Sequence, residues 1–231
     1  GRYPSVALEK LGDQMPFWDR SLDLVLATHP DDDHVAGLVE VVERYRVSRL
    51  LTNGAAADDD PAYDALLAAA EAVGVPIHAV QTGEAIMLDE GVRLEAVHAG
   101  GSADAPNDAS VVLLLTYDEF SLLLTGDAGT AAETAMLESG QPLAADVLKA
   151  GHHGANTSSS APFLAAVAPQ VVIISVGADN TYGHPAPEML ARAVAVEATV
   201  LRTDELGTIE VVSDGESAWW EGERVTSSPN P

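Results

Sequence analysis

The amino-acid sequence predicts an α/β fold, with β-strands inside and helices outside. Three observations support this class. Apolar strand-like segments alternate along the chain with segments that carry apolar residues at helical spacing. Hydrophobic residues make up 47% of the 231 residues, which is enough for a sizeable core. Polar residues that could bind metal ions follow several of the predicted strands, and open α/β sheets place their sites at strand ends.

The first part of the chain shows this alternation most clearly. In order, we expect a helix, a strand, a helix, a strand and a helix over residues 4–15, 22–28, 35–45, 49–52 and 61–72. Pro16 closes the first of these helices and Gly74 the last, because proline cannot continue a helix and glycine favours its end. The second segment is apolar almost throughout, which predicts a strand buried on both faces.

The middle and end of the chain add hairpins to the pattern. Further strands are expected over residues 77–80, 85–88, 92–97, 146–150, 171–175 and 199–203. Two hairpins are expected over residues 110–125 and 208–220. Helices are expected over residues 130–137, 160–167 and 187–196. Thr130 followed by Glu133 is the pattern of a capping box, so we place the start of a helix there.

One domain is the simplest account of this element order. We expect it to cover residues 1–222 and the remaining residues, 223–231, to form a disordered tail. No internal repeat or low-complexity linker interrupts the chain, and the longest apolar runs are far shorter than the roughly 20 residues of a membrane helix. Nothing at the start resembles a signal peptide, so we expect the chain to be a domain excised from a longer protein.

Charge and cysteine content exclude several kinds of protein. The formal net charge is -25, and a field this negative repels polyanions over most of the surface. The chain is therefore not expected to bind DNA tightly on its own, although bound divalent ions would cancel part of the charge. There are no cysteines, which excludes disulfides and thiolate metal ligands and leaves the cellular compartment open.

A cluster of ligand-type residues follows the first predicted strand. Within six consecutive residues, His29 to His34, the chain carries two imidazoles and three carboxylates. So many charged and polar side chains are unfavourable in a hydrophobic core, because buried charges need partners. The same side chains are suitable ligands for a cation. Asp31 and Asp33 alternate as candidate ligands, and Asp32 between them is expected to be solvated.

Four further clusters lie next to later strands. Asn107 and Asp108 precede one strand, and Asp127 follows a run of three leucines. Lys149 leads into a segment in which His152 and His153 are flanked by glycines, which let backbone and ligand approach closely. A fourth cluster ends in His184, between Gly183 and Pro185. His78 and His98 have no acidic neighbours in sequence and are expected to be structural.

These motifs together resemble the metallo-β-lactamase superfamily. The closest resemblance is to the metallo-β-lactamase-like domain at the C-terminal end of ComEC-family DNA-uptake competence proteins. That branch shows His-x-Asp-x-Asp-His, then Thr-Gly-Asp, Leu-Lys-x-Gly-His-His-Gly and Tyr-Gly-His-Pro, which this chain carries in that order. The resemblance implies a four-layer αββα sandwich. The N-terminal strands of that sandwich and its Asp-Gly-Gly turn are expected to be missing from this chain.

The resemblance also implies two divalent metal ions and their ligands. His29 and Asp31 would belong to the first position, and Asp127 would bridge both. The second position would be held by Asp33, His34 and His152. Oxygen ligands replace imidazoles at the first position, where Asp31 and Asn107 or Asp108 stand. This change favours Mn²⁺, with Zn²⁺ or Mg²⁺ as alternatives.

The function implied is a metal-dependent nuclease that degrades the non-transforming DNA strand during natural transformation. Asp33 would orient a water molecule and also hold metal, while His153 and His184 would bind phosphate oxygens or protonate the leaving oxygen. Asn107 and Lys149 are further candidates for substrate binding. The implied partners are single-stranded DNA and the membrane channel of the same full-length protein. The implied location is a soluble domain on the extracytoplasmic face of the bacterial inner membrane.

Two other functions fit the same residues. The first is hydrolysis of small phosphodiesters or esters, which activity on chromogenic substrates would distinguish. The second is a non-catalytic, metal-stabilised module of a DNA-uptake channel, which the net charge and the altered first metal position both favour. A β-lactamase is not expected, because the first-position histidines are incomplete.

Overall fold

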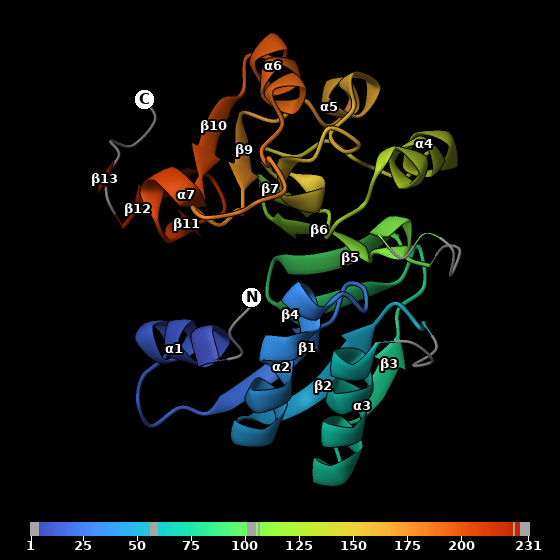
Figure 1. The fold of residues 1–231 in the computed structure, drawn as a ribbon, viewed down its shortest axis with the longest axis vertical. Helices are drawn as coiled ribbons and strands as arrows, with labels where there is room; N and C mark the ends of the chain where they lie inside the picture. The colour runs from blue at the N-terminus through green and yellow to red at the C-terminus, as the bar shows by residue number, and fades with distance from the viewer. Residues whose placement is uncertain (1–4, 56–59, 101–104, 106, 224, 227–231) are drawn as a thin grey trace. The chain divides into compact units, whose positions relative to one another are not determined.

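The structure is a computed structural model that describes residues 5–55, 60–100, 105, 107–223 and 225–226. The chain divides into two compact units (Figure 1). The first unit comprises Gly1–Gln81 and Ala99–Val111, and the second comprises Thr82–His98 and Val112–Pro231. The predicted domain, residues 1–222, thus contains two α/β units, and the predicted α/β class is confirmed.

The first unit is built on a parallel sheet of three strands in the order β1, β2, β3. These strands are Ser21–Leu26, Arg46–Thr52 and Ile77–Ala79. Parallel neighbours need crossover connections, and the helices α2 and α3 supply them. The three helices are α1 (Ser5–Gln14), α2 (Asp32–Arg44) and α3 (Pro61–Val73). Helices α2 and α3 lie side by side over one face of the sheet (Figure 1).

The core of the first unit lies between that sheet and those helices. Val25 of β1 and Leu50 of β2 are buried with Val35 and Val42 of α2, and with Leu66 of α3. Gly74 ends α3 in a left-handed conformation (φ 76°), as the sequence predicts, because glycine has no Cβ to oppose it. The burial of these aliphatic side chains fixes where β1 ends, and therefore where the residues that follow it lie.

Helix α2 begins three residues earlier than predicted. The acidic residues Asp32 and Asp33 and the imidazole of His34 lie in its first turn, and Asp31 is its N-cap. The apolar spacing that predicts this helix starts only at Val35, so it does not include these polar residues. Carboxylates are favourable in a first helical turn, since they oppose the positive end of the helix dipole, so the helix can start within the acidic run.

The second unit is built on a sheet of seven strands in the order β10-β9-β8-β7-β6-β5-β4. Its strands are Ala85–Asp89 (β4), Val92–His98 (β5), Val112–Tyr117 (β6), Phe120–Leu124 (β7), Val147–Lys149 (β8), Val171–Ile174 (β9) and Thr199–Arg202 (β10). Strands β4 to β7 pair antiparallel, whereas β7 to β10 pair parallel. The parallel half therefore gathers the carboxyl ends of β7, β8 and β9 at one edge.

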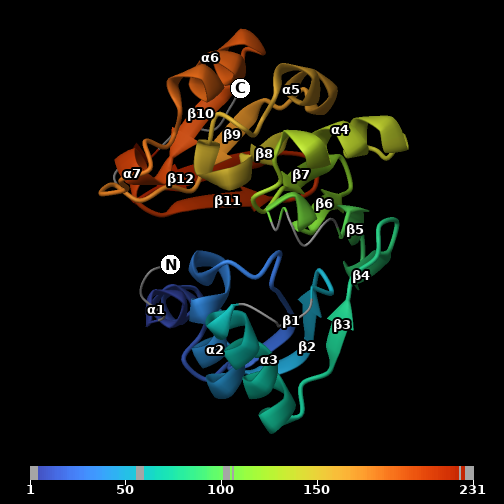
Figure 2. The ribbon, with the colours of Figure 1, turned by 45° about the vertical axis from the view of Figure 1, so that its right-hand side comes forward.

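Two layers cover the two faces of this sheet, as Figure 2 shows. Val172 and Ile174 pack toward the helical layer, and Val171 and Ile173 toward the opposite layer, because successive strand residues point to opposite faces. The helical layer consists of α4 (Thr130–Ser139), α5 (Ala161–Val167) and α6 (Pro187–Ala195), whereas the short α7 (Thr203–Leu206) packs through Leu206 on the opposite face. The opposite layer is a sheet of β11 (Ile209–Ser213), β12 (Ala218–Gly222) and β13 (Val225–Thr226).

The predicted capping box at α4 is wrong. The N-cap is Gly129, without a side-chain cap. Thr130 Oγ1 instead donates to the carbonyl of Thr157, and the Glu133 carboxylate accepts from the backbone N–H groups of Ser159 and Ser160. Both side chains bond to a distant loop, because that loop supplies buried backbone groups that need partners.

Two expectations concern the end of the chain and the membrane. Within the predicted disordered tail, Val225–Thr226 pair with β12 as β13, and residues 224 and 227–231 lie outside the described residues. Among the residues that the structure describes, no helix has the length and apolarity that a membrane crossing requires.

Candidate metal centre

His29 follows β1 and is fully buried. Its ring atom Nδ1 lies 3.0 Å from the Thr28 hydroxyl and 3.3 Å from the Ser110 hydroxyl. The other nitrogen, Nε2, lies 3.7 Å from a carboxylate oxygen of Asp31. Metal-binding histidines are commonly oriented by a partner at the second ring nitrogen. The two hydroxyls occupy that place here, so Nε2 is the atom of His29 suited to a metal.

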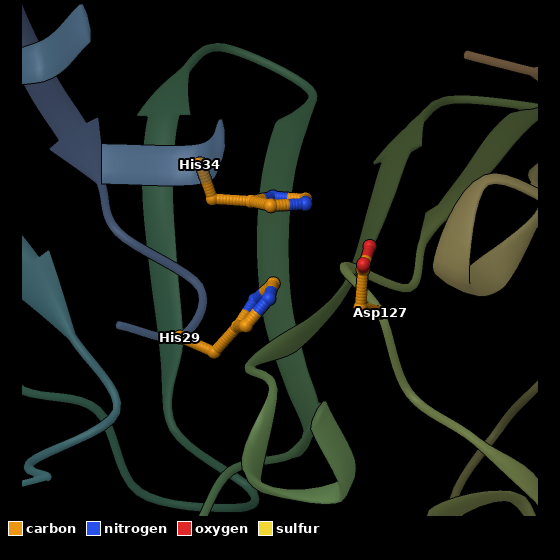
Figure 3. A group of neighbouring side chains, drawn as sticks. All are labelled: His29, His34 and Asp127. Carbon is orange, nitrogen blue, oxygen red and sulfur yellow. The ribbon is translucent and has the colours of Figure 1, made fainter. Parts of the chain in front are cut away.

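His34 lies in the first turn of α2, and its ring lies beside that of His29. The two ring centroids are 4.2 Å apart, and one nitrogen of each ring lies within 4.8 Å of the other. Both side chains extend in the same direction from the end of β1 and the start of α2 (Figure 3). Asp33 Oδ2 lies 3.7 Å from His34 Nε2. The first unit thus brings four predicted ligands, His29, Asp31, Asp33 and His34, into one cluster.

The segment that supplies Ser110 is tied firmly to the first unit. The Asn53 side-chain amide donates to the carbonyl of Ala109 at 3.1 Å, and the Val111 N–H donates to the carbonyl of Thr28 at 2.9 Å. Asn107 opens the short 3₁₀ turn η1 (Asn107–Ala109), three residues before Ser110. The sequence analysis named Asn107 and missed Ser110, because a serine before a strand carries no signal for a histidine 81 residues away.

Asp127 occupies the turn after β7 in the second unit, where Figure 3 also draws it. Its side chain is buried, and a charge in such a place needs partners. Lys149 Nζ lies 3.5 Å from Asp127 Oδ1 and donates to the carbonyl of Gly126 at 2.6 Å. Lys149 therefore stabilises the turn that carries Asp127. This role differs from the substrate binding predicted from the sequence.

His153 lies on the other side of Asp127. Its Nε2 lies 3.5 Å from Asp127 Oδ2, and its Nδ1 donates to the carbonyl of Ser175 at 2.7 Å. This orientation is again that of a metal-binding histidine, with the second nitrogen held by a carbonyl. The sequence resemblance implies His152 as the metal ligand and His153 as a substrate-binding residue. The geometry within this unit makes His153 a candidate ligand as well.

His152 and His184 form a second pair of rings in this unit. Their centroids are 5.6 Å apart, and the Tyr182 ring stacks on His184 at 6.1 Å. Asn180 holds the turn, since its side chain accepts from the His184 N–H and donates to the His184 carbonyl. Burial, together with the positive charges of His152 and His153, lowers the pKa of His184 despite the opposing effect of Asp127.

The turn that carries His152 and His153 is strained. Both residues adopt left-handed backbone angles, with φ of 45° and 53°, which costs of order 1–3 kcal/mol for each non-glycine residue. Gly151 before them is needed for space, because a Cβ there would lie 2.5 Å from the carbonyl oxygen of Ala128. The surrounding structure must therefore hold this turn in place.

The donors in both units suit divalent metal ions. The first unit presents two imidazole nitrogens with carboxylates beside them, and the second presents a buried carboxylate with an imidazole beside it. Imidazole and carboxylate are the ligands of Zn²⁺, Mn²⁺ and iron, and the chain offers no thiolate. The residues present therefore fit the metals that the motifs imply.

Comparison with known proteins agrees with this chemistry. The family described as the metallo-beta-lactamase superfamily matches residues 19–178. The chain is 31% identical over 196 residues to ComE operon protein 3 of Bacillus subtilis (strain 168), covering 83% of this chain and 24% of that protein. It is also 31% identical over 196 residues to competence protein ComA of Neisseria gonorrhoeae, covering 83% of this chain and 25% of that protein. The chain thus spans about a quarter of the length of these relatives.

A solved structure shares the fold. CmlA, a diiron β-hydroxylase from Streptomyces venezuelae, superposes with a TM-score of 0.54 at 15% sequence identity, covering 82% of this chain and 44% of that one. At this identity the likeness concerns the fold alone. The match over residues 19–178 and the identity to the two relatives settle the family. The chain belongs to the metallo-β-lactamase superfamily, and its homologues are ComEC-family competence proteins.

Proposed function

We propose that this chain is the metal-dependent nuclease domain of a DNA-uptake protein and that it degrades the non-transforming strand. The observation that carries the proposal is the buried carboxylate of Asp127, flanked by Lys149 and His153 at the ends of strands that bear the family motifs. The name of one relative, competence protein ComA, supports DNA as the substrate.

The order of the family motifs along the chain supports two divalent ions and a set of ligands for each. His29 and Asp31 would hold the first ion. Asp33 and His34 would hold the second, together with His153 or His152, and Asp127 would bridge the two. Oxygen ligands at the first position favour Mn²⁺, with Zn²⁺ or Mg²⁺ as alternatives. When bound, such ions activate water at neutral pH and neutralise the charge of a phosphodiester.

The remaining polar residues would bind and orient the substrate. Asp33, exposed at the start of α2, would orient the attacking water molecule in addition to holding metal. Burial lowers the pKa of His184, which favours the neutral ring, and this ring would offer an N–H to a phosphate oxygen. Asn107 lies in the turn beside Ser110 and is a further candidate for phosphate binding.

The net charge limits how this domain would meet DNA. With a formal charge of -25, most of the surface repels a polyanion. We therefore propose that DNA is delivered by the membrane channel of the same full-length protein rather than bound tightly by this domain. The expected place is the extracytoplasmic face of the bacterial inner membrane.

Cleavage of a single-stranded oligonucleotide in the presence of Mn²⁺ tests the proposal. We expect cleavage by the wild-type chain, and loss of cleavage in Asp127→Ala and in His34→Ala. The matched control is Asp32→Ala, since this carboxylate lies in the same helical turn and is exposed. Cleavage that survives both substitutions would overturn the assignment.

Two further measurements separate the alternatives. Activity on a chromogenic phosphodiester or ester, without activity on DNA, would indicate hydrolysis of a small substrate. Binding of no metal after incubation with Mn²⁺ or Zn²⁺ would indicate a non-catalytic module of the uptake channel.

A further inference from the structure

We propose that Arg192 and Glu133 are positioning residues that clamp the loop over residues 156–160 and thereby hold the strained turn of His152 and His153. This inference rests on the proposed function in one respect only, which is that the turn faces a metal. All the contacts involved lie within the second unit.

The turn needs support because two successive residues are strained. His152 and His153 have φ of 45° and 53°, and Ser159, in the loop that follows, has φ of 52°. None of the three is a glycine, so each would relax to an ordinary conformation unless neighbouring groups prevent it. Within the described residues, Ser158 of this loop, Ala186 and Ser175 each hydrogen-bond to the turn or to a residue that flanks it.

Ser158 connects the loop to the turn. Its side chain is fully buried, and its hydroxyl lies 2.7 Å from the carbonyl of Gly151 and 3.1 Å from that of Ala155. These two carbonyls belong to the residues on either side of the His152–Gly154 stretch. A shift of Ser158 would therefore remove one hydrogen bond on each side of the turn.

Arg192 of α6 holds the carbonyl side of the loop. Its guanidinium donates to the carbonyls of Asn156, Ser158 and Ser159 at 3.0, 2.9 and 2.9 Å, and to the Asn156 side chain at 3.0 Å. A guanidinium presents five N–H donors in a rigid plane, so it can fix several spread-out acceptors at once, whereas a lysine ammonium presents three donors from a single atom.

Glu133 of α4 holds the amide side of the same loop. Its side chain is buried, and its two carboxylate oxygens accept from the backbone N–H groups of Ser159 and Ser160. Burial raises the pKa of Glu133, and hydrogen bonds from Ser160 and Ser159 and the charge of Arg192 oppose that shift. A buried carboxylate is costly unless fully paired, so its placement here indicates a demand for a fixed loop geometry.

The clamp has a consequence for His153. With the turn held, His153 Nδ1 donates to the carbonyl of Ser175, which leaves Nε2 directed at Asp127. Partners that orient a ligand in this way are worth about 10–100-fold in metal affinity. Arg192 and Glu133 act one step further out, through the loop.

The test measures the affinity of the protein for Mn²⁺ by calorimetry and the visible spectrum of its Co²⁺ form. We expect Arg192→Gln to lower the Mn²⁺ affinity at least about tenfold and to change the Co²⁺ spectrum. We expect smaller changes in the same direction for Arg192→Lys and Glu133→Gln. The matched control is Arg202→Gln, because Arg202 is also half-buried in this unit but pairs with Asp204 and Glu205.

The control separates positioning from stability. A purely structural role would lower the melting temperature in Arg192→Gln and Arg202→Gln alike while leaving metal affinity and spectrum unchanged in both. That result would overturn the clamp. If Arg192→Gln does not fold, Asn156→Ala and Arg192→Lys remove fewer of the contacts, and wild-type affinity in both would overturn it equally.

A measurement without metal keeps this inference apart from the proposed function. In metal-free protein, the ¹⁵N shifts of the His153 ring report which nitrogen carries the proton. We expect the Nδ1–H form in the wild type and loss of that preference in Arg192→Gln. If the wild type binds no metal, the proposed function is wrong. Unchanged ¹⁵N shifts in Arg192→Gln would instead contradict the proposed positioning role of Arg192.

Discussion

The two units present their candidate ligands in opposite ways. In the first unit, His29, Asp31, Asp33 and His34 come from one continuous stretch at the start of α2. In the second unit, Asp127, His153 and His184 come from the ends of different strands, and the backbone at His153 is strained (φ 53°). The first arrangement depends on local structure, and the second depends on tertiary contacts that the sequence does not display.

This difference predicts different tolerance to substitution. The first cluster keeps its geometry as long as α2 forms and the Thr28 and Ser110 hydroxyls hold His29. A cluster made by separate strand ends keeps its geometry only while loops such as residues 156–160 stay in place. The second unit should therefore be the more sensitive of the two.

The largest effect is expected from Asp127→Asn. This carboxylate is buried, and the proposed function makes it a metal ligand, so its loss should lower DNA cleavage by about a thousandfold, equivalent to several kcal/mol of charge stabilisation. The comparison is Asp31→Asn in the first unit, whose side chain is 41% exposed and should matter less. Steady-state rates with Mn²⁺ measure both, and a larger loss in Asp31→Asn would reverse the ranking of the units.

Alanine in place of glycine should have opposite effects in the two units. At Gly151, the new Cβ would lie 2.5 Å from the Ala128 carbonyl oxygen, which should cost about 1–3 kcal/mol of unfolding free energy. At Gly12 in α1, nothing lies within 4 Å, so alanine should stabilise the helix by roughly 0.5–1 kcal/mol. Urea denaturation measures both changes. Equal effects at the two positions would show that the turn has room to adjust.

Ser110→Ala tests the hydroxyl support of the first unit. Its hydroxyl lies 3.3 Å from His29 Nδ1, so its removal should weaken the orientation of that ring and lower Mn²⁺ affinity about tenfold. Ser48→Ala on β2 is the control, because Ser48 is exposed in the same unit. Wild-type affinity in Ser110→Ala would mean that the Thr28 hydroxyl alone orients His29.

Sequence reasoning succeeded where the signal was local. The alternation of apolar residues located the strands and helices to within a few residues, and the dense run from His29 to His34 identified the first cluster. It misjudged the start of α2 because it weighed apolar spacing above the preference of acidic residues for a first helical turn.

Sequence reasoning failed where a side chain serves a distant segment. Thr130 and Glu133 have the spacing of a capping box, yet both bond to the loop over residues 157–160. Ser110 supports His29 from a separate part of the chain. A left-handed turn at His152 and His153 decides that the His153 ring faces Asp127. Two adjacent histidines in a sequence do not indicate which of the two rings will do so.

The smallest predicted effect compares one ion pair from each unit. Arg202 donates to both carboxylate oxygens of Asp204, and these hydrogen bonds lower the pKa of Asp204 although burial opposes them. A lowered folded-state pKa contributes stability above the unfolded pKa, and that stability is lost as pH falls through the folded value. Asp204→Asn should therefore destabilise the protein at pH 7 by roughly 0.2–1 kcal/mol, and less at a pH below the ordinary value of 3.8.

The counterpart in the first unit is Glu40→Gln, which removes the pair between Glu40 and Arg44. That arginine is 61% exposed, so water screens the pair and we expect a change of at most a few tenths of a kcal/mol. Urea denaturation at pH 7 and pH 3 compares the two variants. An equal loss of unfolding free energy in Asp204→Asn at both pH values would contradict the pKa argument. It would mean that ionisation of the Asp204 carboxylate does not stabilise the second unit.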